Sequence, residues 1–315
     1  SSPVQATSGS IINQEGRIPF SGRECSAGAE EAARLVHYFD VFRHPLRVDE
    51  LSRLVGLEGA DLDAAVREAS RLGVERDGRW VFRLGRGDDR GGRQQRARAA
   101  ERLWKRARLA AAALARVPFV RGVLVTGSLS KQSASDDGDI DFMLLVAAGR
   151  AWTVKSGLHA ARRLLPGAAR ESLCTNYILD EQSLAIPERT MFTAVELATA
   201  VPMAGNAACV ALLDANAWAH RFVPGLEGSR ARAALAPPIA PSRALEGRVP
   251  AAWEEHARAA MQRFWSWRYR WLQEQDRLKR FKQEPGVATN HLHDHSAWVA
   301  REFAARCEAH GVRLP

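Results

Sequence analysis

The chain has 315 residues, 46% of them hydrophobic, and a net charge of +9; this length suffices for about two domains that each bury a core. The chain has no run of about 18 apolar residues and its opening is polar, so we expect neither a membrane-spanning helix nor a secretory signal. The positive charge favours polyanionic partners such as nucleotides, while four cysteines without metal-ligand spacing favour a reducing, cytoplasmic compartment. Residues 1–28 are predicted to be a disordered tail or a tag.

Residues 29–86 are predicted to form a winged-helix-like domain. Apolar residues recur at helical spacing before His44-Pro45 and again over 48–55 and 60–72. Asp-Gly between two short apolar runs then predicts a hairpin. The third helix offers only two arginines, Arg67 and Arg71, against three acidic side chains, so two interpretations stay open. The unit either binds DNA or serves in packing and protein contact.

Residues 87–119 are predicted to be a linker followed by a long basic helix. The linker, Asp88 to Arg93, is charged and rich in glycine, and the helix runs from Gln94 to Arg116. A basic helix face is usually solvated. Because this helix leads directly into the next strand, the alternative is that its basic face is turned towards phosphate groups.

The most informative segment lies within residues 120–186, which are predicted to form an α/β core. One apolar strand ends in Gly127-Ser128, and after a polar connection a second apolar strand opens with Asp139 and Asp141. Because alternate side chains of a strand share a face, the two carboxylates project together and suit Mg²⁺. The Gly-Ser turn lets the backbone approach a phosphate and offers it an N–H and a hydroxyl.

Residues 187–315 are predicted to be a helical domain. Strand signals end at Pro187, and helices are predicted over 193–200, 206–220, 250–282 and 295–310. The expected fold class is therefore α/β (α+β), with an N-terminal winged-helix-like domain and an α-helical C-terminal domain.

A hydrophobic strand, Gly-Ser, a spacer and Asp-x-Asp within a hydrophobic strand resemble the signature of the DNA polymerase β-like nucleotidyltransferase superfamily. The resemblance implies a nucleotidyltransferase core in which Asp139 and Asp141 hold Mg²⁺ or Mn²⁺. It implies that Gly127 and Ser128 hold the β- and γ-phosphates of an NTP, with ATP as the first expectation. Lys131 is a candidate counter-charge for the phosphates. An equally weighted alternative is that Lys131 is simply an exposed lysine of the turn.

The family pattern has a third carboxylate on a later strand, and here the sequence departs from it. The strand over 173–179 has Asn176 at its centre, Asp180 four positions later and Glu171 just before it. An asparagine can ligate a metal but cannot accept a proton as a base. Either Asp180 supplies the carboxylate or Asn176 occupies its position, and we favour Asn176 because it lies in the middle of the strand.

A second resemblance, to a group of bacterial nucleotidyltransferase-domain proteins, covers residues 176–216. It depends on Asn176-Tyr177, on the sequence Met-Phe-Thr-Ala over 191–194, and on Asn-Ala-Trp over 216–218. The implied function is Mg²⁺-dependent transfer of an NMP from an NTP to an unidentified acceptor, with release of pyrophosphate. A protein or small molecule is favoured over a nucleic acid end as the acceptor. The alternative is a catalytically impaired protein of this fold that acts as a nucleotide- or DNA-binding regulator. The sequence indicates no oligomeric state.

Overall fold

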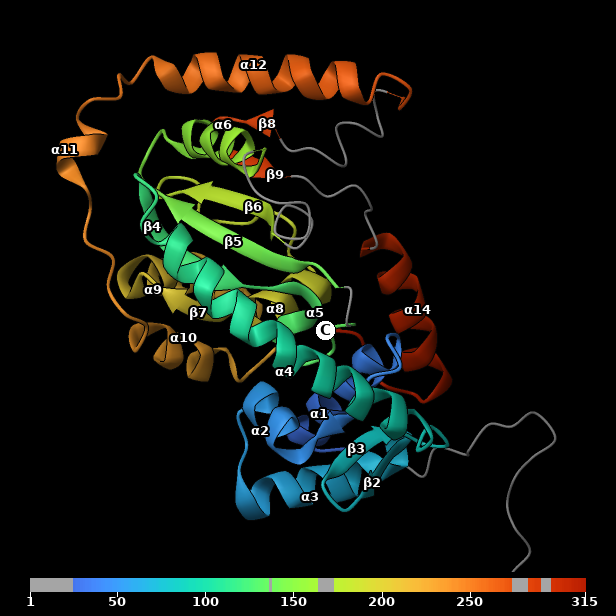
Figure 1. The fold of residues 1–315 in the computed structure, drawn as a ribbon. Coiled ribbons are helices and arrows are strands. Elements are labelled where there is room, and N and C mark those ends of the chain that lie inside the picture. Colours follow the sequence, from blue (N-terminus) through green and yellow to red (C-terminus); the bar gives the residue numbers. More distant parts are fainter. Residues whose placement is uncertain (1–24, 136–137, 164–172, 274–282, 290–295) are drawn as a thin grey trace, which may run out of the picture.

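Figure 1 shows the fold in a computed structural model that describes residues 25–135, 138–163, 173–273, 283–289 and 296–315. The strands are β1 (Leu46–Arg47), β2 (Val74–Asp77), β3 (Trp80–Arg83), β4 (Val120–Val125), β5 (Ile140–Val146), β6 (Leu173–Asp180), β7 (Val201–Ala204), β8 (Gln283–Glu284) and β9 (Val287–Thr289). The helices are α1 (Ala27–Asp40), α2 (Val48–Val55), α3 (Gly59–Ala69), α4 (Asp89–Leu114), α5 (Gly127–Ser130), α6 (Ala151–Arg162), α8 (Met191–Thr199), α9 (Asn206–Ala215), α10 (Leu226–Ala234), α11 (Arg243–Glu246), α12 (Trp253–Arg268) and α14 (Ser296–Ala309). The mixture of helices and sheets confirms the predicted α+β class.

The N-terminal unit, which we define as residues 25–86, contains the elements that its sequence pattern predicts. Its three helices pack beside a small antiparallel sheet with the strand order β1-β3-β2. The hydroxyl of Ser26 accepts a hydrogen bond from the N–H of Ala29 and caps α1. The helix predicted over 60–72 is α-helical to Ala69 and ends in a 3₁₀ turn, after which Gly73 takes a left-handed conformation with φ 76°. The predicted tail overlaps α1, which begins at Ala27, and residues 1–24 lie outside the described residues.

The predicted linker before the long basic helix is wrong, because α4 is already helical from Asp89. The helix continues across the two glycines at 91 and 92, and Arg93 in its second turn is buried with 1% of its surface exposed. The buried alanines and leucines further along α4 pack on the six-stranded sheet. The tertiary contacts of Arg93 and of this apolar stripe outweigh the poor helix propensity of glycine. Figure 1 shows α4 running from the N-terminal unit to the sheet.

The six-stranded sheet has the strand order β7-β4-β5-β6-β9-β8 and helices on both faces. Strands β4 and β5 are antiparallel, whereas β5 and β6 are parallel and are connected through α6. Successive residues of β5 alternate between two buried clusters. Phe142 and Leu144 pack with α4, α6 and α12, while Met143 and Leu145 pack with α8, α9 and the N-terminal unit. Asp141 has the parity of Met143, so its side chain lies on the face that α8 covers.

The prediction that no strand follows residue 187 is wrong. Strand β7 pairs with β4 at one edge of the sheet, and β9 pairs with β6 towards the other edge. Strands β7, β8 and β9 have two to four residues each, which is too short for a periodic pattern to reveal them. Strand β7 also contains Pro202, which an edge strand tolerates because one of its sides forms no ladder. The C-terminal part of the chain is therefore helical with added edge strands.

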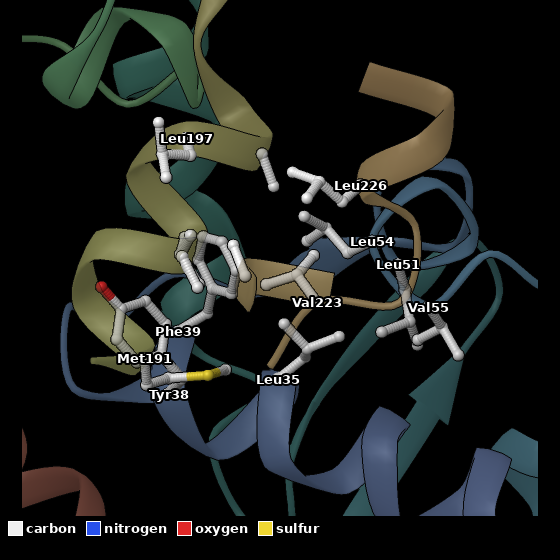
Figure 2. Packing of buried hydrophobic residues seen from close by; sticks show 14 of the residues in the cluster. Leu35, Tyr38, Phe39, Leu51, Leu54, Val55, Met191, Leu197, Val223 and Leu226 are labelled. Atoms are coloured by element: carbon white, nitrogen blue, oxygen red, sulfur yellow. The ribbon is translucent and has the colours of Figure 1, made fainter. Parts of the chain in front are cut away.

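The N-terminal unit shares one core with the C-terminal helices. In Figure 2, Leu35 and Phe39 of α1 lie close to Met191 of α8 and to Val223, which precedes α10. Helix α14 also packs against α1. The same cluster contains residues of β4 and β5. The segments before and after the predicted boundary at residue 187 therefore bury their apolar surface together. No helix in the described parts of the chain is both long and apolar enough to cross a membrane.

Candidate functional site

The site begins where β4 ends beside the start of β5. The N–H of Thr126 donates to the carbonyl oxygen of Asp141 over 2.9 Å, which places the following Gly127 against the Asp141 carboxylate. Gly127 has φ 68°, and a Cβ atom at this position would overlap Oδ2 of Asp141. Glycine is required here both for its left-handed backbone and for this close approach. The structure thus brings together two of the predicted site residues.

Asn176 lies at a bulge that points its side chain to the same carboxylate. In the register of β5 and β6, Phe142 pairs with Thr175 and Met143 pairs with Tyr177, which leaves Asn176 as the extra residue. A bulge of this kind can redirect a side chain. Here Nδ2 of Asn176 donates to Oδ1 of Asp141 over 2.5 Å. Asn176 therefore contacts Asp141 from the neighbouring strand, where the third carboxylate was expected.

Asp180 lies at the opposite end of the sheet from Asp141. It pairs with Val146, whereas Asp141 pairs with Cys174, six residues earlier on β6; at the rise of a strand this separation corresponds to about 20 Å. The Asp180 carboxylate is buried and accepts hydrogen bonds from the N–H groups of Gly149, over 2.9 Å, and Gln182, over 3.0 Å. Asp180 thus fixes two loops and does not reach the site. Glu171 lies outside the described residues.

Glu196 of α8 is a site residue that the sequence pattern does not reveal. Its Oε2 accepts from the N–H of Gly127 over 3.3 Å, and its Oε1 accepts from Nζ of Lys131 over 2.8 Å. It is the one charged residue within the sequence of α8, and a lone carboxylate in an otherwise apolar helix is the signal that could have identified it. The contact joins residues 69 positions apart, so no local motif contains it.

Ser128 and Lys131 follow Gly127 in the turn. Ser128 is exposed, and its carbonyl oxygen accepts from the N–H groups of Lys131 and Ser133 over 3.2 and 2.9 Å, which closes the turn. Lys131 is mostly buried, and its Nζ also donates to the carbonyl oxygen of Gly127 over 3.0 Å. The alternative of an exposed turn lysine is therefore wrong.

The electrostatics of the site are dominated by negative charge. Burial first, and then the charges of Glu196 and Asp139, together raise the pKa of Asp141 to about 6, against the lowering effects of Lys131 and Asn176. Asp139 is exposed immediately before β5. A cation would relieve the repulsion among these carboxylates, since opposite charge favours the ionised form.

The donor set suits Mg²⁺, which commonly takes one or two protein carboxylates and completes its shell with water and substrate phosphate. Asp139 and Asp141 would supply the carboxylates. Within the described residues, no group of three or more His, Cys, Asp or Glu side chains is arranged to hold a metal ion. An ion here would therefore depend on substrate oxygens and water as well as on the chain.

The basic helix α4 contacts the turn that carries Lys131. The Arg93 guanidinium donates to the carbonyl oxygens of Gln132, over 2.7 Å, and Lys131, over 3.3 Å. It also donates to His44 over 3.0 Å and to Glu50 over 2.8 Å. These four hydrogen bonds connect the N-terminal unit to the turn. This part of α4 is therefore not a solvated face, and Arg93 helps to position the turn.

Comparisons of the chain with protein-family models, with curated proteins and with solved structures found no match.

Proposed function

We propose that the chain is a Mg²⁺-dependent nucleotidyltransferase that transfers an NMP from an NTP to an acceptor and releases pyrophosphate. The observation that carries the proposal is the packing of the Gly127 turn against Asp141. A backbone N–H, the Lys131 ammonium and two carboxylates then lie within one small region. This arrangement offers donors to phosphate oxygens beside ligands for a divalent cation. The likeness of Gly-Ser and Asp-x-Asp to the polymerase β-like superfamily supports the same interpretation.

Each residue has a definable part in the transfer. The new bond forms between an acceptor oxygen or nitrogen and the α-phosphorus, and the bond to the β-phosphate oxygen breaks. Bound Mg²⁺ supplies neutralisation of charge on the attacking and leaving oxygens. Asp139 and Asp141 would hold it, while the Gly127 N–H and the Ser128 hydroxyl would orient the outer phosphates. Both the Gly127 N–H and Lys131 contact Glu196 in the structure, and phosphate oxygens would replace that carboxylate as their acceptor.

The acceptor is the least constrained part of the proposal. We favour a protein or a small molecule over a nucleic acid end, because α3 of the N-terminal unit carries few basic side chains. The exposed Arg67 and Arg71 share that segment with acidic groups, and Asp63 is itself paired with Arg76 over 2.5 Å. ATP is the first nucleotide to test.

The experiment is incubation of the pure protein with each α-labelled NTP, Mg²⁺ or Mn²⁺, and cell extract. We expect label on an acceptor or on the protein itself, together with pyrophosphate. The double variant Asp139→Asn/Asp141→Asn should lose both signals, because it removes the two metal-ligating charges. Asp61→Asn, which removes an exposed charge on α3, is the matched control and should retain them. Pyrophosphate release that persists in the double variant would refute the assignment.

Asn176 favours a second candidate, a nucleotide- or DNA-binding regulator that retains this fold without turnover. Its amide donates to the carboxylate oxygen that would otherwise be available to a metal, and it cannot act as a base. A regulator would bind Mg²⁺-nucleotide and release no pyrophosphate in the labelling experiment. If calorimetry shows nucleotide binding while the labelling experiment yields no labelled product, the regulator is the correct assignment.

A further inference from the structure

A cavity, which we call the arginine cavity, lies between the N-terminal unit and α4. Its volume is about 320 Å³. Its lining includes Arg47, Arg79, Trp80, Arg93, Arg98 and Gln132. Gly127, Asp139, Asp141 and Glu196 are not among its lining residues, so it is distinct from the candidate active site.

The lining carries four guanidinium groups and a single carboxylate, that of Glu101. Two of these arginines already have partners. Arg93 pairs with Glu50 over 2.8 Å, and Nε of Arg47 lies 3.4 Å from the same glutamate. The other two, Arg79 and Arg98, are exposed and form no ion pair with any residue in the described ranges of the chain.

The placement of Arg79 and Arg98 indicates what the cavity would hold. Arg79 precedes β3 and Arg98 belongs to α4, so the two groups approach the cavity from different elements. The guanidinium of Arg79 lies 5.6 Å from the ring centroid of Trp80, which is 8% exposed and gives the cavity a rigid aromatic wall. A guanidinium binds phosphate oxygens through paired N–H donors. Ligand pockets start at about 300 Å³, so the cavity suits a small ligand.

We propose that the arginine cavity binds a small phosphate-bearing metabolite, with Arg79 and Arg98 as its charge partners. The ligand carries at least two negative charges, which complement the two guanidiniums that form no ion pair within the described part of the chain. Binding at this cavity does not depend on the proposed nucleotidyl transfer.

The cavity is also connected to the turn of the active site. Gln132 lines it, and the carbonyl oxygen of the same residue accepts from Arg93, which lines it as well. An occupant would restrain this pair and with it the turn that carries Lys131. This second step, a regulatory one, rests on the proposed function, whereas the binding does not.

The binding test is calorimetric titration of the full chain with inorganic pyrophosphate in EDTA, which removes the divalent ion that the candidate active site would require. We expect saturable binding that the double variant Arg79→Ala/Arg98→Ala weakens by at least tenfold. The control Arg67→Ala/Arg71→Ala removes the same charge from α3 and the 3₁₀ turn that follows it, and it should change the affinity by less than threefold. Trp80→Phe should abolish a ligand-dependent change in tryptophan fluorescence.

Three results would overturn the proposal: no binding by the wild-type chain, equal weakening by the two double variants, or a fluorescence change that survives Trp80→Phe. Equal weakening would mean general attraction of an anion to a basic protein. The variant Asp139→Asn/Asp141→Asn should bind pyrophosphate in EDTA as the wild type does. A chain that binds pyrophosphate in this way but transfers no nucleotide would retain the cavity assignment and lose the proposed function.

The regulatory step has its own readout. Pyrophosphate in EDTA should slow hydrogen exchange in the peptide covering residues 126–133 of the wild-type chain and leave it unchanged in Arg79→Ala/Arg98→Ala. If pyrophosphate binds but leaves hydrogen exchange of this peptide in the wild type unchanged, the cavity binds a ligand without affecting the turn. That result would contradict the regulatory step.

Discussion

Replacement of Asp141 by asparagine should stabilise the metal-free protein. Burial and the neighbouring carboxylates raise the pKa of Asp141 from 3.8 to about 6. The native state therefore holds this proton more tightly than the unfolded chain does. Stability consequently falls as the pH rises from 3.8 to about 6, and the full penalty is present above that range.

The size of the effect follows from the two pKa values. At 1.36 kcal/mol for each pH unit, the interval between 3.8 and about 6 corresponds to about 3 kcal/mol. Asparagine is nearly isosteric and retains an oxygen that can accept from the Asn176 amide, so little else is lost. We expect Asp141→Asn to raise the free energy of unfolding by about 3 kcal/mol at pH 7.5 and by about 1 kcal/mol at pH 4.5.

The assay is urea unfolding in EDTA at both pH values. Asp180→Asn is the matched control, because it alters a second buried aspartate of the same sheet. The Asp180 carboxylate accepts hydrogen bonds from two backbone N–H groups, and weakening them should lower the free energy of unfolding by about 1–3 kcal/mol. In a parallel series without EDTA, Mg²⁺ added together with ATP should stabilise the wild type and have little effect on Asp141→Asn. An Asp141→Asn protein that is no more stable than the wild type at pH 7.5, or whose gain does not change with pH, would refute the reasoning.

Four further outcomes follow from the structure. Gly127→Ala should cost about 1–2 kcal/mol in urea unfolding for its left-handed backbone and should also weaken Mg²⁺-nucleotide binding in calorimetry, because its Cβ overlaps Asp141. Arg93→Ala should lower the free energy of unfolding by about 3–5 kcal/mol, since it breaks the buried ion pair with Glu50 and leaves two carbonyl oxygens without the guanidinium that donates to them. Asn176→Asp should preserve or raise pyrophosphate release, and a large loss in that assay would contradict its placement beside the proposed metal ligands. The N-terminal unit should bind duplex DNA weakly and without sequence preference, with an affinity that falls steeply with salt in a filter-binding titration.

The sequence predicts the part of the site that lies on consecutive elements. The alternation of strand residues puts Asp139 and Asp141 on one face, and the Gly-Ser turn follows from the end of the preceding strand. The structure brings Gly127 and Asp141 into contact as this pattern requires. The preference for Asn176 over Asp180 agrees with the hydrogen bond from Asn176 to Asp141. This hydrogen bond depends on a bulge in β6, and the periodicity of the sequence alone does not reveal that bulge.

The contacts that the sequence does not predict are those between distant segments. Glu196 reaches Gly127 because α8 covers one face of the sheet, a consequence of tertiary packing. Arg93 resembles any other arginine of a charged linker until the fold surrounds it with hydrogen-bond acceptors. The Asn-Ala-Trp motif at 216–218 has a similar explanation. The buried Asn216 side chain accepts from the Ile186 N–H and donates to backbone carbonyl oxygens, so it fixes a loop and lies outside the candidate site.

If the site binds nucleotide and metal as proposed, the contacts of Glu196 imply that the two ligands bind cooperatively. In the structure Glu196 occupies the Gly127 N–H and the Lys131 ammonium, and its charge raises the pKa of Asp141. A triphosphate that takes over these donors adds negative charge beside the carboxylates, which is unfavourable unless a cation enters with it. A cation alone finds only the chain carboxylates and water. Each ligand would therefore supply what the other lacks, and we expect the coupling between them to be positive and reciprocal.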